Sequence, residues 1–312
     1  MKIGIIGAGF VGSTTAYTLV IKGLAEEIVL IDLNSEKAEA EALDNLHAAA
    51  MNNPCKVYCG GYYDLKNADI VVLTVDSQKT LVADRLELLE SNGKILHSLI
   101  PEIVKQAPNC ILLLATNPVD VMTRLAQEIS GFPKQRVIGS GTVLDSARFR
   151  ALLGEKLGLC PQSIHAYVLG EHGSSSVVSW STASIGGVKI EEYAAKIGRP
   201  ISKDEQKEIA KQVIDAGFKI SRGKKATYYG IASSLVKIIE AIAFDKKCDL
   251  TVSTLHEDVY GISNICLSLP TLVGKAGAYQ TVLPNLSENE MIALKKSAVV
   301  MEQADKKAEK QQ

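Results

Sequence analysis

The chain of 312 residues is long enough for two domains, and its 46% hydrophobic and 22% charged residues are typical of a globular protein. Its 34 basic and 35 acidic residues give a net charge of -1 without a basic run, which argues against nucleic acid as a partner. No apolar run approaches the roughly 20 residues of a membrane-spanning helix, and the six cysteines, with no CxxC pair, favour reduced thiols in the cytoplasm over disulfides or a zinc site.

Short apolar runs alternate with helical patterns through the first half of the chain. The run "DIVVLTV" is continuous and rich in β-branched residues, which is typical of a strand that is buried on both faces. This alternation predicts a doubly wound parallel sheet of the Rossmann type, joined by crossover helices, that ends near residue 140. We expect its strands at "KIGIIG", "EIVLID", "KVYCGG", "DIVVLTV" and "CILLLAT", and its helices over residues 11–22, 35–50, 86–106 and 119–129.

The second half of the chain mixes helical and strand-like segments in no regular order. Helical patterns cover residues 144–157, 203–222 and 232–243, and apolar runs stand at "DLTVSTL" and "NICLSLPTLVG". This mixture predicts an α+β domain over residues 141–312. We place the first domain over residues 1–140, and we expect close packing between the two because no low-complexity linker separates them.

The sequence "GAGFVG" is a GxGxxG motif made by Gly7, Gly9 and Gly12. It follows a predicted strand, opens a predicted helix, and precedes Asp32 at the end of the next strand, which is the context of a dinucleotide site. Gly7 would form the tight turn, Gly9 would let the backbone approach a pyrophosphate, and Gly12 would let the helix approach the strand. Asp32 would bind the adenosine ribose and repel a 2′-phosphate, so we expect NAD rather than NADP. The alternative is a glycine turn without a ligand.

Four further motifs carry polar residues that suit a catalytic site. Asn117 in "ATNPVD" follows a predicted buried strand, at the carboxyl edge where α/β sheets bind ligands. The other three motifs are "GTVLDSARFR" with Asp145 and Arg148, "LGEHGSSS" with His172, and "KKATYYGIA" with Thr227. Each has a simpler explanation, because a helical acid and base often pair on the surface and a single histidine is usually structural.

Together with Arg85, these residues suit the reduction of a 2-keto acid. Histidine titrates near neutral pH, so His172 can give a proton to the carbonyl oxygen and take it back. Asp145 can orient the ring and stabilise its protonated form. One arginine fork matches a carboxylate and a second arginine can polarise the carbonyl, and these two roles suit Arg148 and Arg85. The sequence predicts no metal site.

The combination of these motifs resembles the L-lactate dehydrogenase family, within the lactate/malate dehydrogenase superfamily. The resemblance runs from "GAGFVG" to "NICLSLPTLVG" and so covers nearly the whole chain. It implies that His172 is the proton donor and acceptor with Asp145 as its partner, and that Arg148 clamps the substrate carboxylate. It implies that Arg85 polarises the carbonyl from a loop that closes over the substrate. It also implies substrate contacts for Asn117 and Thr227, and contacts with NAD for Val11, Asp32, Lys37, Tyr62, Ser98, Asn117 and Ser140.

The resemblance extends to regulation and assembly. Arg150 and His165 match positions where bacterial members of the family bind fructose 1,6-bisphosphate across a subunit interface. The simpler explanation is a surface arginine and a histidine in a strand. The resemblance also implies a homotetramer or a homodimer.

The loop before Arg85 departs from the family pattern. Where the family reads like "TAGANQKPGETR", this chain reads "TVDSQKTLVADR", which puts Lys79, or Gln78 after a shift of one residue, at the specificity position. Ser174 replaces the usual acid after "GEHG".

We expect an L-lactate dehydrogenase, and these departures leave alternatives for the substrate. One is an enzyme for larger branched 2-keto acids, as the L-2-hydroxyisocaproate dehydrogenases are. Another is a malate dehydrogenase, if Lys79 mimics the family's dicarboxylate-binding arginine. A third, from a different class, is a non-catalytic NAD-binding protein, against which the complete set of His172, Asp145, Arg148 and Arg85 argues.

Overall fold

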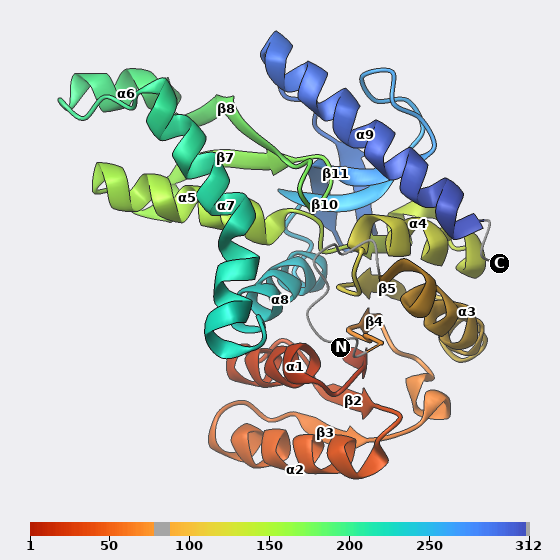
Figure 1. The fold of residues 1–312 in the computed structure, drawn as a ribbon. Helices are drawn as coiled ribbons and strands as arrows, with labels where there is room; N and C mark the ends of the chain where they lie inside the picture. The colour runs from red at the N-terminus through yellow and green to blue at the C-terminus, as the bar shows by residue number, and fades with distance from the viewer. Residues whose placement is uncertain (78–87, 310–312) are drawn as a thin grey trace.

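The computed structural model describes residues 1–77 and 88–309. Six parallel strands form the first part of its main sheet, in the strand order 3-2-1-4-5-6 of a doubly wound dinucleotide-binding fold. They are β1 (Lys2–Ile6), β2 (Glu27–Ile31), β3 (Lys56–Cys59), β4 (Ile70–Leu73), β5 (Ile111–Leu114) and β6 (Val137–Gly139). The expected Rossmann sheet is therefore confirmed (Figure 1).

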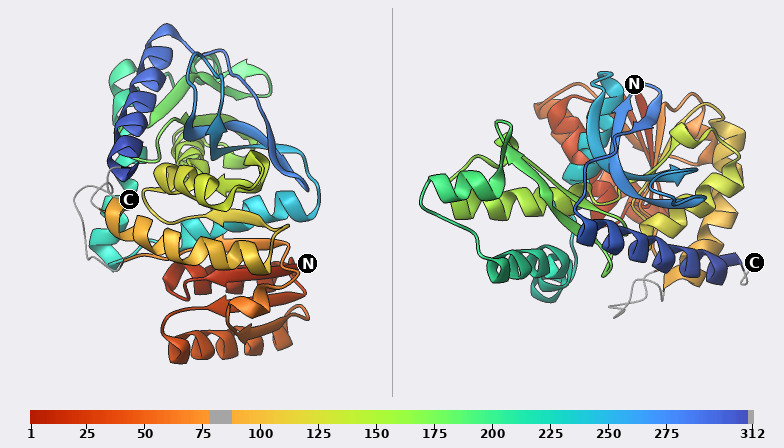
Figure 2. Two further views of the ribbon diagram at one scale, coloured as in Figure 1. Left: turned by 90° about the vertical axis from the view of Figure 1, so that its right-hand side faces the viewer. Right: turned by 90° about the horizontal axis from the view of Figure 1, so that it is seen from above.

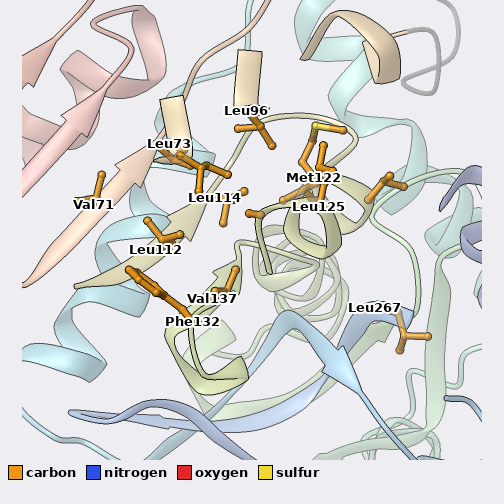
Figure 3. Close-up of a cluster of buried hydrophobic side chains, with 14 of the residues drawn as sticks. Val71, Leu73, Leu96, Leu112, Leu114, Met122, Leu125, Phe132, Val137 and Leu267 are labelled. Carbon is orange, nitrogen blue, oxygen red and sulfur yellow. The ribbon is translucent and has the colours of Figure 1, made fainter. Parts of the chain in front are cut away.

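Helices cover both faces of this sheet. One face carries α1 (Phe10–Lys22), α2 (Ser35–Met51) and α8 (Tyr229–Ala243), and the other carries α3 (Leu89–Gln106), α4 (Val119–Ser130) and α9 (Glu288–Glu309). Because side chains alternate along a strand, Ile70 and Val72 pack on the first group while Val71 and Leu73 pack on the second. Figure 3 shows the core on the second face, where Leu96 and Met122 from the helices lie over Leu73 and the other strand residues.

The second half of the chain extends the same sheet. Strands β10 (Cys248–His256), β11 (Ile265–Gly274) and β12 (Gly277–Thr281) continue it beyond β6 in antiparallel pairing, so the sheet has nine strands in the described part of the chain. Within the sheet, β10 meets β6 through the single pair of Ser253 and Gly139, and α8 and α9 add contacts with the helices of the first half. This continuity accounts for the close packing that the sequence predicts.

A separate lobe stands beside this sheet, and Figure 2 shows it projecting to one side. It contains the three-stranded sheet of β7 (Ile164–Leu169), β8 (Val177–Ile185) and β9 (Val188–Lys189) and the helices α5 (Val143–Leu157), α6 (Ile190–Lys196) and α7 (Lys203–Lys224). Phe149, Ala166 and Val213 are fully buried in its own core. The mixed α+β character expected for the second half is confirmed, although the sequence patterns missed β7, β8, β9, α6 and β12.

Short 3-10 helices also occur in the described part of the chain, at η1 (Tyr62–Leu65), η3 (Lys134–Arg136) and η4 (Pro161–Ser163). Over residues 1–77 and 88–309, the helices are each too short or too polar to cross a membrane.

Candidate active site

The glycine-rich turn between β1 and α1 forms an open cradle. Gly7 has a φ of +103°, a conformation that favours glycine, and a side chain at Gly12 would start 1.9 Å from the carbonyl oxygen of Gly7. At Gly9, by contrast, a Cβ would meet only the Nζ atom of Lys37, 4.0 Å away. The first turn of α1 has neither a side-chain cap nor an acidic residue, so its N–H groups are available to an anion. The turn therefore fits a pyrophosphate, as NAD requires.

Asp32 is fixed against this cradle. Its Oδ2 atom accepts the backbone N–H of Ala8 at 2.7 Å, and its Oδ1 atom accepts that of Asn34 at 3.0 Å. The side chain of Asn34 in turn caps α2 by accepting the N–H of Lys37. The carboxylate of Asp32 is thus fixed at the turn, and Nζ of Lys37 lies near Gly9, beside the place expected for NAD.

The other residues predicted to contact NAD divide into two groups. Tyr62 opens η1 after β3, Asn117 follows β5 and the buried Ser140 follows β6, so these three lie at the carboxyl edge of the sheet with Gly7 and Asp32. Two others lie on helices: Val11, half-buried in the first turn of α1, and Ser98, exposed in the middle of α3.

Asn117 provides an independent sign of a ligand at this edge. Its Oδ1 atom is buried and has no hydrogen-bond partner among the described residues. Buried polar atoms in proteins are nearly always bonded, so this oxygen points to a missing donor such as a substrate or a nicotinamide amide. Thr227, half-buried just before α8, was predicted to line the same pocket.

Asp145 brings two of the predicted residues together. Its Oδ2 atom lies 2.6 Å from Nδ1 of His172, and its Oδ1 atom lies 2.7 Å from a terminal nitrogen of Arg148. All three side chains are largely buried, with exposed fractions of 8% for Asp145 and 14% for each partner. Asp145 and Arg148 come from α5, and His172 comes from the loop between β7 and β8.

This contact sets the chemistry of the histidine. A carboxylate only accepts hydrogen bonds, so Nδ1 of His172 carries the proton in the contact and Nε2 is the nitrogen that can exchange one. Arg148 also lines a pocket of about 430 Å³ between α5 and α7, so its side chain can be reached from outside the core. The arrangement suits proton transfer next to a bound carboxylate.

Two buried residues that the sequence reasoning missed support these loops. Asp120, in the first turn of α4, accepts the backbone N–H of His172 at 2.8 Å. Asn92, fully buried on α3, donates to the carbonyl oxygen of Asn117 at 2.7 Å and accepts the N–H of Ser77 at 2.9 Å. In the sequence, Asp120 stands between two valines, whereas Asn92 stands in the polar stretch "ESNGK", and neither pattern alone separates them from surface residues.

The remaining predicted residues of the substrate site are those of the loop before Arg85, and Ser174. Gln78, Lys79 and Arg85 lie outside the described residues, as does the rest of the segment 78–87. Ser174 is exposed, two residues after His172.

The pair predicted for fructose 1,6-bisphosphate lies in the lobe. His165 is exposed on β7, and Arg150 is half-buried on α5, where burial lowers the pKa of its guanidinium. Tyr167 and Asp249 lie near enough to Arg150 to counteract that lowering, and the Tyr167 hydroxyl donates to Asp249 at 2.5 Å. An acid therefore already stands beside this arginine.

A dinucleotide cradle at the carboxyl edge of a Rossmann sheet, with a carboxylate-bound histidine in the adjoining lobe, defines a dinucleotide-dependent oxidoreductase. Residues 1–139 match the family model for the NAD-binding domain of lactate/malate dehydrogenases, and residues 142–312 match the model for their α/β C-terminal domain. The chain belongs to the lactate/malate dehydrogenase family.

Individual relatives agree with this assignment. An L-lactate dehydrogenase of Thermus aquaticus is 46% identical over 97% of this chain and 98% of its own length. One of Acetivibrio thermocellus is 43% identical over 95% of this chain and 93% of its own. Among solved structures, the minor L-lactate dehydrogenase of Enterococcus mundtii superimposes with a TM-score of 0.94 at 36% identity and covers 98% of both chains.

Proposed function

We propose that this protein is an NAD-dependent L-lactate dehydrogenase, which interconverts pyruvate and L-lactate. The observation that carries the proposal is the 2.6 Å contact between Nδ1 of His172 and Asp145, in a chain whose full-length relatives bear that name. A histidine held in this way can give and take a proton at Nε2 near neutral pH.

Reduction of pyruvate adds a hydride to its C2 carbon and a proton to its carbonyl oxygen. NADH, when bound, would supply the hydride. His172 would supply the proton from Nε2, and Asp145 would stabilise the protonated ring before that transfer and after the reverse one. Arg148 uses one nitrogen to bind Asp145 and has further N–H groups with which to bind the substrate carboxylate. Arg85 is assigned to polarising the carbonyl on the sequence resemblance.

Four described residues support NAD as the cofactor. Gly7 allows the tight turn, Gly12 allows the close approach of the helix, Gly9 leaves its backbone open, and Asp32 is held beside the turn. The carboxylate of Asp32 would accept hydrogen bonds from a ribose and repel a 2′-phosphate, so the proposal specifies NAD rather than NADP.

The proposal includes a cytoplasmic homotetramer or homodimer that responds to fructose 1,6-bisphosphate. Reduced thiols support the compartment, since the six cysteines are all free. Arg150 and His165 support the effector, because cations that face each other across an interface would repel until a phosphate bridges them. Asp249 beside Arg150 would oppose a phosphate there. Addition of the effector should therefore lower the KM for pyruvate only if the phosphate displaces that acid.

A panel of keto acids assayed with NADH tests the proposal. Pyruvate, 2-ketoisocaproate and oxaloacetate would be compared by kcat/KM, with and without fructose 1,6-bisphosphate. We expect pyruvate to be the best substrate. A higher value for oxaloacetate would identify a malate-type enzyme, and the absence of NADH oxidation with all three would identify a non-catalytic protein.

A further inference from the structure

Asp120 is an acid in the core of the protein. It is 2% exposed on α4, between Val119 and Val121, which are equally buried. An ionised carboxylate is costly in such surroundings unless it is bonded or paired. Burial accordingly raises the pKa of Asp120 to about 6. A residue of this kind needs a compensating interaction.

Only one of the two carboxyl oxygens of Asp120 is hydrogen-bonded within the described residues. Its Oδ2 atom accepts the backbone N–H of His172 at 2.8 Å, whereas Oδ1 has no hydrogen-bond partner in the described part of the chain. The buried hydroxyl of the neighbouring Ser253 on β10 helps to lower the pKa of Asp120 against the effect of burial, although its oxygen lies outside strict hydrogen-bond geometry. Among the described residues, the backbone N–H of His172 thus makes the hydrogen bond of good geometry to Asp120, and the Ser253 hydroxyl lies next to the carboxyl group.

The loop that carries His172 has a second anchor of a different kind. The N–H of Glu171 donates to Oγ of Ser297 on α9 at 2.8 Å, and Ser175 contacts the same oxygen at 3.0 Å. This anchor is neutral, whereas Asp120 adds a charge. If the loop needed only to be held in place, a second neutral side chain would serve, and the cost of a buried carboxylate would be avoided.

We propose that Asp120 is a positioning residue for His172, which fixes the backbone of its loop and favours the protonated form of its ring. The proposal rests on the proposed function, in which the protonated ring supplies the proton to the substrate. A negative charge acts strongly over short distances in a medium from which water is excluded, and it stabilises a nearby cation.

Other charged groups act on the same ring. Asp145 and Arg148 face it from α5 with opposite signs, and Glu171 precedes it in its own loop. The thiol of Cys266 on β11 lies near Asp120, and Asp120 contributes to raising the pKa of that thiol. A substitution must therefore remove the charge of Asp120 while leaving these groups in place.

Asp120→Asn meets that requirement, because the amide oxygen can still accept the N–H of His172. The matched control is Glu128→Gln on the same helix, which removes a carboxylate that is paired with Arg124 at the surface at 2.7 Å. Asp120→Ser, neutral and smaller, replaces Asp120→Asn if circular dichroism shows that the amide variant is not folded.

The readout is the titration of His172 by NMR, in protein with carbon-13 at Cε1 of its five histidines. His172→Gln identifies the signal. We expect the midpoint in Asp120→Asn to fall by about half a pH unit or more, with Glu128→Gln at the wild-type value. The pH at which kcat/KM for pyruvate begins to fall should be lowered in Asp120→Asn by the same amount as the midpoint. At a pH above both midpoints, kcat/KM of the variant should therefore be roughly threefold below that of wild type.

An unchanged or higher midpoint in the neutral Asp120 variant would overturn the proposal, as would an equal fall in Glu128→Gln. The NMR measurement needs neither NADH nor a keto acid. A lowered midpoint in a protein that does not oxidise NADH with any keto acid would therefore contradict the proposed function while leaving the influence of Asp120 on His172 in place.

Discussion

The Oδ2 atom of Asp145 lies 2.6 Å from Nδ1 of His172, although the two residues are 27 positions apart in the chain and lie on different elements. The same carboxylate binds Arg148 through its other oxygen. One buried acid thus orients both the proposed proton donor and the proposed carboxylate clamp, and this double use gives the first prediction.

Asp145→Asn should lower kcat/KM for pyruvate by roughly tenfold to a hundredfold at pH 7, because the protonated ring loses its partner charge. The fall in activity with rising pH should also begin at a lower pH. The control is Asp204→Asn, which removes an exposed acid with the same three-residue spacing from Lys207. Equal activity and equal pH profiles in wild type and Asp145→Asn would refute the role of this acid.

Cofactor choice should depend on Asp32. The wild type should strongly prefer NADH to NADPH, and Asp32→Ala should narrow that preference by removing the charge that repels a 2′-phosphate. The measurement is kcat/KM for each dinucleotide at a fixed pyruvate concentration. Asp44→Ala, which removes an exposed acid from α2, controls for a general change in charge. Equal use of NADPH by the wild type would be incompatible with this assignment.

Acid should destabilise the protein partly through His256. Burial lowers the pKa of this histidine from 6.5 to about 4. Between pH 6.5 and pH 4 the unfolded chain therefore binds a proton at this residue, whereas the folded chain does not. Stability is therefore lost as the pH falls from 6.5 to 4, by up to about 3 kcal/mol from this residue.

His256→Gln keeps an N–H donor for the carbonyl oxygen of Leu267, which His256 contacts at 3.0 Å, but cannot take up a proton. Urea unfolding at several pH values should show the variant gaining on the wild type as the pH falls. His47→Gln, at an exposed position on α2, should run parallel to the wild type. Parallel curves for wild type and His256→Gln would count against the pKa shift.

Substrate ranking should depend on the loop that contains Lys79, a prediction from the sequence alone. We expect Lys79 to point into solvent, because its ammonium is strongly hydrated. Leu81 and Val82 should then allow longer aliphatic keto acids to be tolerated beside pyruvate, with about 1–3 kcal/mol for each methylene accommodated. Pyruvate and 2-ketoisocaproate should then be reduced and oxaloacetate rejected. Lys79→Gln should change the ranking only, whereas Arg85→Gln should lower kcat on every substrate. Oxaloacetate leading in wild type and losing that lead in Lys79→Gln would show instead that Lys79 points inward.

The fold of the first half can be predicted from the sequence because its strands are buried on both faces. Val71, Val72 and Leu73 leave no polar face, and the glycines at residues 7, 9 and 12 mark the turn that follows β1. The lobe was harder to predict. Strand β8 reads "VVSWSTASI", and its serines and threonines resemble a loop unless the partner strand is known. The two halves join through the pair of Ser253 and Gly139 and through the packing of α8 on α1, and no local sequence pattern predicts such contacts between distant segments.

In the candidate site, too, some features could be predicted from local sequence and others depend on tertiary packing. Chemistry and spacing indicated His172 and Asp145, but their contact depends on how α5 and the loop after β7 pack together. Asp120 was missed because an acid in the first turn of a helix is favoured by the helix dipole and has a sufficient local explanation. Its burial and its bond to His172 are properties of the tertiary structure.

The most direct test of this account is to measure two quantities in His172→Gln: kcat for pyruvate reduction and the Kd for NADH. Because the proposed proton donor is separate from the dinucleotide cradle, kcat should fall by at least about a hundredfold, while the Kd stays within about threefold of wild type. A variant that keeps more than about a tenth of wild-type kcat with its NADH affinity intact would contradict the assignment of His172 as the proton donor.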